Sequence, residues 1–256
     1  MKQRLPGSPV FTPGSPSNYP RLSDPAGASP SSFPEELFHS SWPLVFLKRD
    51  ENGWFADPAG NSLPYVKHPG TIDWDEQLLL VEKTLKHLTP RQKAIARYWD
   101  TDNVIQKCAA SADRLFGIPF TLQLPLLPLL LSIPEDIHIL VLLPGAIHDA
   151  LMVCWTVKYR YKTARPNQLG SPLSSFLPTP RQPSFISAHA TIAGMMAELL
   201  GGFFPAERNR LQKLAEECAA SRVYGGVHFP VDCSEGLRIG RAIGRSIAGF
   251  YSRQPD

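Results

Sequence analysis

The spacing of apolar residues predicts helices over most of the chain after residue 73. Apolar positions three or four residues apart share one face of a helix. This spacing starts after Asp73, which offers a cap with an acid three positions on, and Thr89-Pro90 and Ser132 to Glu135 repeat the start signal. The expected helices cover about 73–88, 90–99 with a continuation over 104–115, 136–164 with a bend at Pro144, 188–203, 205–220 and 232–251.

Before residue 73 the pattern is not helical. Residues 1–43 contain nine prolines and nine serines. Proline fixes φ and lacks an amide donor, so this range is either a disordered arm or an extended strap lying on the domain. Residues 44–66 alternate apolar runs with Asn52-Gly53, which is a hairpin signal. We therefore expect an all-α helical bundle over 44–256, with an extended Pro/Ser-rich N-terminal strap (1–43) and a small β-hairpin.

Composition narrows the class of protein. The 256 residues are 43% hydrophobic and 19% charged, with a net charge of +3, which indicates a globular protein with no basic stripe for a nucleic acid. No secretory signal is visible, so the sequence as written predicts a cytoplasmic protein. The most membrane-like window, 137–157, contains His138, Pro144, His148 and Asp149, which favours a core helix over a membrane span. The four cysteines form no CxxC pair and do not indicate zinc.

Two basic residues stand out near the end of the long helix expected over 136–164. Lys158 and Arg165 are seven residues apart, so on a helix both project from one face. Pro166 disfavours helix at Arg165 and should end the element there. The pair can grip an anion, or it can simply complement the helix macrodipole.

A second group of polar residues opens the helix expected at 188. Ser187 is placed to cap this helix, and the first-turn amides, those of Ala188 and His189 among them, form a natural anion site. His189 would lie at the mouth of that site. The alternative is a surface histidine near a helix start.

A third group surrounds a Gly-Gly turn. Arg222 precedes the turn, His228 follows it, and Asp232 comes four residues later, where one helical turn brings its carboxylate back to the imidazole. By itself this stretch could be a helix end with a solvated aspartate. Together the three groups supply three cations, a hydroxyl, helix-terminal amides and two histidines. That set suits a tetrahedral or trigonal-bipyramidal oxyanion such as phosphate or vanadate.

The order and spacing of these groups resemble a known signature. Lys158-(six residues)-Arg165-Pro166, then Pro183 to His189, then Arg222-(five residues)-His228-(three residues)-Asp232 look like the three-part motif of the type 2 phosphatidic acid phosphatase / vanadium haloperoxidase superfamily. The residues around Asp149 and Trp155 look more like the soluble haloperoxidase branch.

The resemblance implies a role for each residue. Lys158, Arg165 and Arg222 would hold the equatorial oxygens of the anion, together with Ser187 and the backbone amide of Ala188. His228 would bond to vanadium in a haloperoxidase or to phosphorus in a phosphatase, Asp232 would orient His228, and His189 would be the acid and base. Trp155 and Gln182 would line a halide or substrate pocket.

Two positions depart from the family pattern. Position 188 is alanine where the family has glycine, and Gln182 stands where characterised haloperoxidases tend to carry an aromatic residue or histidine. The added methyl group could crowd the anion or demand a dihedral that alanine dislikes. The glutamine leaves the use of halide open.

Three functions follow from this sequence. The first is a vanadate-dependent haloperoxidase that oxidises halide with hydrogen peroxide. The second is a soluble acid phosphatase that hydrolyses phosphomonoesters through a phosphohistidine and needs no cofactor. The third is a non-catalytic helical protein with a relict anion site. All three take small molecules and not nucleic acid, and a homo-oligomer is compatible with each.

Overall fold

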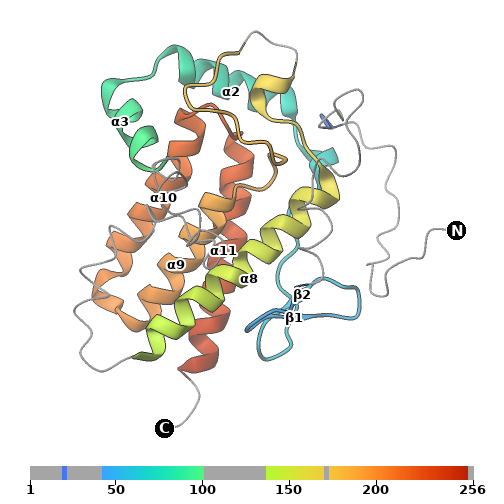
Figure 1. Ribbon diagram of the computed structural model, residues 1–256, viewed down its shortest axis with the longest axis vertical. Coiled ribbons are helices and arrows are strands. Elements are labelled where there is room, and N and C mark those ends of the chain that lie inside the picture. The colour runs from blue at the N-terminus through green and yellow to red at the C-terminus, as the bar shows by residue number, and fades with distance from the viewer. Residues whose placement is uncertain (1–18, 22–41, 101–136, 170–172, 253–256) are drawn as a thin grey trace, which may run out of the picture.

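The computed structural model describes residues 19–21, 42–100, 137–169 and 173–252 (Figure 1). Over these residues the protein is mostly helical, which confirms the predicted all-α class. Four long helices pack side by side, and two shorter ones lie at one end of this bundle (Figure 1). The bundle helices are α8 (Ile137–Tyr161), α9 (Ala188–Phe203), α10 (Arg208–Tyr224) and α11 (Pro230–Tyr251); the shorter ones are α2 (Trp74–Lys86) and α3 (Pro90–Tyr98).

The helix starts follow the capping signals in the sequence. Asp73 accepts a hydrogen bond from the amide of Glu76 at the start of α2, and Thr89 forms a capping box with Gln92 at the start of α3. Ser187 caps α9, whose bounds are those predicted. Three-residue 3₁₀ turns at Pro69–Thr71, Pro166–Gln168 and Pro205–Glu207 precede or follow these helices.

Three predicted helix bounds were wrong. α8 ends at Tyr161 instead of residue 164, because Lys162 takes a left-handed φ of 50° and the chain then runs extended toward Pro166. α10 begins after a 3₁₀ turn and continues to Tyr224, four residues beyond its expected end, so Arg222 lies inside the helix. α11 begins two residues early, with Pro230 at its first position. The predicted continuation over 104–115 lies outside the described residues.

The predicted hairpin is present. Strands β1 (Lys48–Arg49) and β2 (Phe55–Ala56) pair antiparallel, with Lys48 opposite Ala56. Gly53 takes a φ of 72° in the connecting turn, a conformation that glycine adopts without cost. The hairpin lies beside α8 (Figure 1).

A buried carboxylate fastens the chain before the hairpin to α8. Both oxygens of Asp149 accept backbone hydrogen bonds, from the amides of Val45, Phe46 and Leu47 at 2.7–2.8 Å. Asp149 is fully buried. Because a buried carboxylate needs donors, these three amides explain why the helix tolerates an acid on its inner face.

A short N-terminal segment lies against the same helix. The carbonyl of Pro20 accepts a hydrogen bond from the amide of Ala164 at 3.0 Å, and Arg21 forms an antiparallel bridge with Thr163. Tyr19 is 8% exposed and packs edge-on against Tyr161. Residues 19–21 therefore pair with Thr163 and Ala164, the two residues that precede Arg165 in the sequence.

Helices α9 and α11 approach each other through small residues. A β-carbon on Gly240 would lie 2.0 Å from the carbonyl oxygen of Thr191, and one on Gly236 would lie 2.8 Å from that of Ser187. Both distances are shorter than a van der Waals contact, so glycine permits the crossing. The close approach places the first turn of α11 beside the first turn of α9, where the amide of Ser187 donates to the carbonyl of Asp232 at 3.0 Å.

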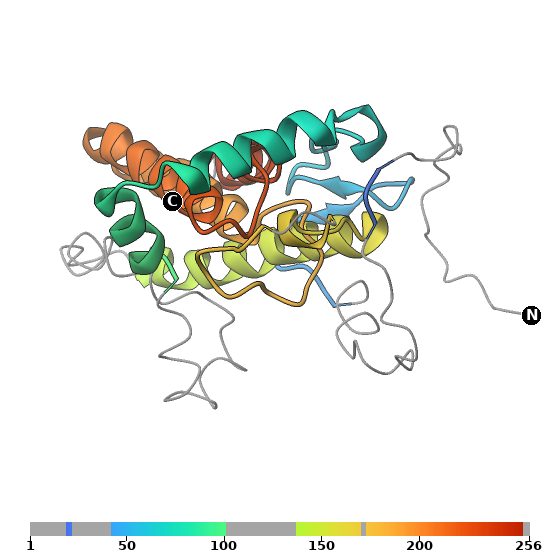
Figure 2. The same cartoon turned by 90° about the horizontal axis from the view of Figure 1, so that it is seen from above.

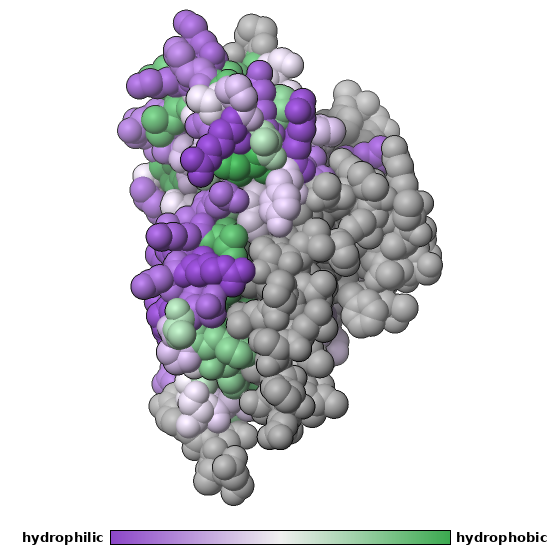
Figure 3. Space-filling view, turned by 90° about the vertical axis from the view of Figure 1, so that its left-hand side faces the viewer, coloured by the Kyte–Doolittle hydropathy of each residue, from purple (hydrophilic) through white to green (hydrophobic). Residues whose placement is uncertain are grey.

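Seen from above, α2 runs across the ends of the bundle helices (Figure 2), and it packs on α10 and α11. On the face shown in Figure 3, hydrophilic residues cover most of the surface that the described residues form, with small hydrophobic patches between them. Among the described helices, none is long and apolar enough to cross a bilayer.

Candidate functional site

The three polar groups predicted from the sequence come together at one end of the bundle. The C-terminal ends of α8 and α10 and the N-terminal ends of α9 and α11 all lie at the end that α2 covers (Figure 1). Neighbouring helices that run in opposite directions bring a C-terminus beside an N-terminus, so motifs far apart in the sequence become neighbours. Lys158, Arg165, Ser187, Arg222, His228 and Asp232 are all nearly or fully buried there.

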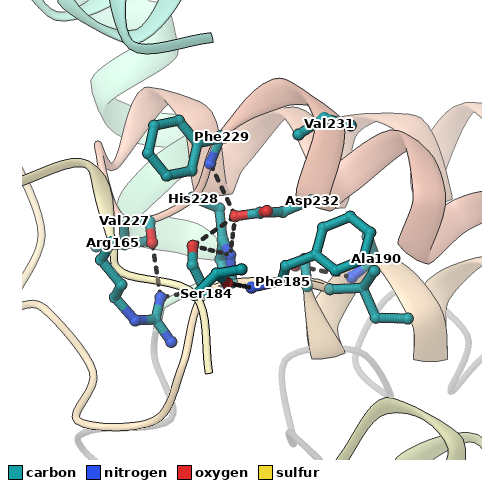
Figure 4. A network of polar contacts seen from close by, with 12 residues as sticks. Arg165, Ser184, Phe185, Ala190, Val227, His228, Phe229, Val231 and Asp232 are labelled. Carbon is teal, nitrogen blue, oxygen red and sulfur yellow. Dashed lines mark hydrogen bonds and ion pairs between the residues drawn. The ribbon is translucent and has the colours of Figure 1, made fainter. Parts of the chain in front are cut away.

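The centre of the site is a histidine–aspartate pair. Nδ1 of His228 lies 2.9 Å from Oδ2 of Asp232, as the four-residue spacing predicts. On the other side of the ring, a guanidinium nitrogen of Arg165 lies 3.3 Å from Nε2 (Figure 4). Because a guanidinium can only donate, Nε2 is the acceptor and Nδ1 carries the proton. Arg165 and Asp232 thus fix one tautomer of His228.

The surroundings keep His228 neutral. Burial lowers the pKa of His228 well below its usual value, and the positive charges of Arg165 and Lys158 lower it further. Burial raises the pKa of Asp232 to about 6, against the hydrogen bonds from Ser184 and the amide of Phe229. At neutral pH, Asp232 is therefore ionised and His228 is an uncharged imidazole with a lone pair on Nε2.

Arg165 and Lys158 cross-link the loop that leads to α9. Nε of Arg165 donates to the carbonyl of Gln182 at 2.8 Å, and its NH1 donates to the carbonyl of Val227 at 2.6 Å. Nζ of Lys158 donates to the carbonyls of Pro183 and Ser184 at 2.5 and 2.9 Å. Burial, reinforced by other positive charges of the cluster, lowers the pKa of Lys158 to about 8 and that of Arg165 to about 9.

Arg222 reaches the site from the last turn of α10. One of its terminal nitrogens forms an ion pair with Asp100 at 3.0 Å, and the other donates to the carbonyl of Trp99 at 3.5 Å. Its Nε is buried and has no hydrogen-bond partner among the described residues. A buried donor without an acceptor is costly, so this nitrogen is available to a ligand.

The start of α9 supplies the hydroxyl and amides that the sequence predicts. Oγ of Ser187 accepts a hydrogen bond from the amide of Ala190 at 3.4 Å. Among the described residues other than glycine, only Lys162 has a positive φ, so Ala188 does not need the dihedral that would favour glycine. His189 is half-buried, and it lies near enough to His228 that its charge lowers the pKa of that residue. Both histidines therefore face the same end of the bundle.

Of the two residues predicted to line a pocket, Trp155 precedes the cluster residues in sequence and Gln182 lies between Arg165 and Ser184. Trp155 is on α8, three residues before Lys158, and stacks on Tyr159 with ring centroids 5.4 Å apart. Gln182 is half-buried and contacts the site through its backbone carbonyl, which holds Arg165. Their role toward a halide or substrate stays a prediction.

Sequence reasoning missed three residues of the site. Asp100 pairs with Arg222, Ser184 donates to Asp232, and Thr163 holds the backbone of Ser184 and Phe185. Ser184 lies within the second group of polar residues, where a hydroxyl near a predicted aspartate could have drawn attention. Asp100 and Thr163 carry no such signal, because only the fold brings them to the cluster.

The charge of the cluster points to an anionic ligand. Lys158, Arg165 and Arg222 are each 2–3% exposed. Among the described residues, two carboxylates face them, those of Asp232 and Asp100, so within this part of the chain one positive charge is left uncompensated. Uncompensated buried charge is unfavourable unless a counter-ion binds. In the described part of the chain, no three His, Cys, Asp or Glu side chains gather as ligands for a metal cation.

Known proteins show the same helical arrangement. Residues 139–255 match the model of the PAP2 superfamily. A bacterial vanadium-dependent iodoperoxidase is 21% identical with a TM-score of 0.53, over 78% of this chain and 55% of that one. A bacterial vanadium-dependent chloroperoxidase in its apo form is 17% identical with a TM-score of 0.55, over 78% and 53%.

A transmembrane PAP2-type phosphatidylglycerolphosphate phosphatase from Bacillus subtilis is also similar, with 18% identity and a TM-score of 0.49, over 71% of this chain and 87% of that one. No curated protein matches the chain. The chain spans about half the length of the two peroxidase structures. At these identities the likeness shows the fold.

Proposed function

The chain belongs to the PAP2 superfamily through residues 139–255, and we propose that it is an enzyme whose buried cations hold vanadate for the oxidation of halide by hydrogen peroxide. The observation that supports this proposal most is the uncompensated positive charge beside a neutral His228. A tetrahedral oxyanion supplies the missing negative charge. The vanadium of vanadate can accept a fifth donor, which the Nε2 lone pair of His228 offers.

The residues of the site fit vanadate as they fit phosphate. Lys158, Arg165 and the unpartnered Nε of Arg222 donate to oxygens, while the hydroxyl of Ser187 and the amide of Ala188 complete the cradle. When bound through His228, vanadate supplies a Lewis-acid centre that activates hydrogen peroxide toward halide.

The chain's own residues prepare the site for this chemistry. Asp232 keeps the proton of His228 on Nδ1, so Nε2 stays available without a change of protonation. The full burial of Ser187, Asp232 and Arg165 excludes bulk water from the floor of the site. In this proposal His189, half-buried at the start of α9, takes a proton from the incoming peroxide and returns it.

The test is halide oxidation by vanadate-loaded protein. With hydrogen peroxide and bromide, chloride or iodide, we expect turnover by the wild type and its loss in His228→Ala. His87→Ala, a histidine of the exposed end of α2, is the matched control and should keep full activity. If the loaded wild type oxidises none of the three halides, the haloperoxidase proposal is wrong.

A phosphatase is the second candidate, and Gln182 favours it. Haloperoxidases resembling this sequence tend to carry an aromatic residue or histidine at that position, whereas a phosphatase needs none. In this reaction Nε2 of His228 attacks phosphorus, the bond from phosphorus to the alcohol oxygen breaks, and His189 protonates the departing oxygen. Water then attacks the phosphohistidine while His189 accepts its proton, which releases phosphate and restores both residues.

Assays on a single preparation of the protein distinguish the two candidate functions. Vanadate-free protein that hydrolyses p-nitrophenyl phosphate, is inhibited by vanadate and loses activity in His228→Ala is a phosphatase. Hydrolysis that persists in His228→Ala excludes the phosphohistidine route. Sulfate binding without turnover in either assay would leave the chain as an anion-binding protein.

A further inference from the structure

The carboxylate of Asp232 is held unevenly. Oδ2 accepts three hydrogen bonds, from the hydroxyl of Ser184 at 2.5 Å, from Nδ1 of His228 at 2.9 Å and from the amide of Phe229 at 3.0 Å (Figure 4). Oδ1 is buried and has no partner among the described residues. The orientation of the carboxylate therefore depends on the donors to one oxygen.

Among these donors, Ser184 is the one that comes from a distant part of the sequence. His228 and the amide of Phe229 lie three or four residues before Asp232 and move with the start of α11. The terminal torsion of an aspartate is soft, so donors on one segment leave it freedom to rotate. The hydroxyl of Ser184 approaches from the loop before α9, lies 3.4 Å from Nδ1 of His228, and ties the carboxylate to a second segment of the chain.

The backbone of Ser184 is itself held on two sides. Its carbonyl accepts from Nζ of Lys158, and its amide donates to the carbonyl of Thr163 at 2.9 Å. Oγ1 of Thr163 accepts from the amide of Phe185 at 2.7 Å. Thr163 therefore binds two successive residues of the loop and sets the position from which the hydroxyl of Ser184 reaches Asp232.

We propose that Ser184 is a positioning residue whose hydroxyl holds the Asp232 carboxylate against Nδ1 of His228, and that Thr163 positions Ser184. The proposal rests on the proposed function in one respect, namely that His228 is the residue that bonds to the bound anion. Ser184 touches neither substrate nor anion in this role. It acts through Asp232, as the outer partners of metal-bound histidines do.

The direct test follows the Nδ1 proton of His228 by NMR in ¹⁵N-histidine-labelled full-length protein. In Ser184→Ala we expect this resonance to move upfield and broaden, because the hydrogen bond to Asp232 becomes longer and less ordered. We also expect a roughly tenfold fall in kcat with KM nearly unchanged, as for other outer partners of catalytic histidines. Ser184→Thr keeps a hydroxyl, so it should restore both the His228 Nδ1 proton resonance and kcat to near their wild-type values.

A matched control is Ser246→Ala on α11, which removes a hydroxyl that bonds a helix carbonyl at 3.0 Å. It should leave the His228 resonance unchanged. Thr163→Val removes one acceptor while keeping the shape of the side chain. We expect it to change the resonance in the same direction as Ser184→Ala, and the double variant to change it no more than Ser184→Ala alone.

The proposal is overturned if Ser184→Ala keeps both the wild-type His228 resonance and the wild-type kcat. If that variant does not fold, an unchanged resonance in Thr163→Val overturns it equally. Failure of the proposed function looks different. In that case the wild type would turn over neither halide nor phosphoester, while the resonance would still respond to Ser184→Ala.

Discussion

A guanidinium nitrogen of Arg165 lies 3.3 Å from Nε2 of His228. This contact occupies the nitrogen that would bond to a bound oxyanion. Arg165 thereby stabilises the neutral ring in the tautomer needed for that bond, and its charge helps to keep the pKa of His228 low. We expect an oxyanion that binds at His228 to replace the imidazole as the acceptor of Arg165.

Arg165→Lys should weaken anion binding. The guanidinium of Arg165 donates to the carbonyls of Gln182 and Val227 and contacts Nε2 of His228 at the same time. The lysine side chain is shorter and carries a single nitrogen, so its ammonium cannot make all three contacts. Loss of a charged hydrogen bond costs about 1.5–3 kcal/mol, so we expect sulfate to bind roughly 10–100-fold more weakly in calorimetry. Arg91→Lys on the exposed side of α3 is the control, and equal affinities in the two variants would contradict the prediction.

Anion affinity should fall as pH rises through about 8. Burial lowers the pKa of Lys158 to about 8, so in the anion-free protein the Lys158 ammonium loses its proton in that range. Sulfate is a suitable probe because its own charge does not change there. The sulfate affinity measured from pH 6.5 to 9.5 should decline as Lys158 loses its proton, and bound sulfate should raise the pKa of this residue. The variant Lys158→Met should show a flatter dependence of affinity on pH over this range.

The same group has the opposite effect on folding stability. The folded-state pKa of Lys158 is about 8, below the ordinary lysine value of 10.5, so between about pH 8 and 10.5 the unfolded chain binds more protons. Stability of the anion-free protein therefore gains a contribution from this residue as pH rises through that window. Comparing denaturant unfolding of the wild type and Lys158→Met at pH 7.5 and 10 checks the sign.

Asp100→Asn should strengthen anion binding. Asp100 is the carboxylate paired with Arg222 at 3.0 Å, and it offsets part of the positive charge of the cluster. Asparagine can still accept a hydrogen bond from Arg222 but carries no charge. We expect sulfate to bind several-fold more tightly, in line with a change of about 1 kcal/mol for a partly exposed pair. Weaker binding would show instead that Asp100 acts mainly by orienting Arg222.

Asp149→Ala should destabilise the fold without touching the site. It removes the acceptor of three backbone amides, including the buried amide of Leu47. Leaving buried donors unpaired should lower the free energy of unfolding by about 2–4 kcal/mol in urea denaturation. Asp75→Ala, at an exposed position of α2, should change it little, and comparable losses in both variants would argue against the role of Asp149.

Gly240→Ala should disturb the crossing of α9 and α11. The new β-carbon would lie 2.0 Å from the carbonyl oxygen of Thr191, and a backbone atom cannot move aside as a flexible side chain can. We expect a loss of at least about 1–3 kcal/mol in unfolding free energy. Gly201→Ala is the matched control, because its β-carbon would meet Arg208 at an ordinary 3.4 Å.

Local signals along the chain account for much of the fold. Capping residues such as Asp73, Thr89 and Ser187 mark helix starts because they satisfy amides within a few residues of themselves. Helix ends are less well marked. α8 stops at Tyr161, where Lys162 takes a left-handed φ, and α10 continues to Tyr224, and the spacing of apolar residues predicts neither end.

The sequence by itself determined the helical class, the starts of α2, α3 and α9, and the residue types of the candidate site, because periodicity, caps and motif spacing are local properties of the chain. The tertiary structure alone decided how these pieces act on one another. It paired Asp100 with Arg222, set Arg165 against His228 and brought Ser184 to Asp232. These contacts join residues that are 122, 63 and 48 positions apart in the sequence, so no local pattern predicts them. They exist because α9 and α11, packed closely side by side through Gly236 and Gly240, bring their N-terminal ends to the C-terminal ends of α8 and α10.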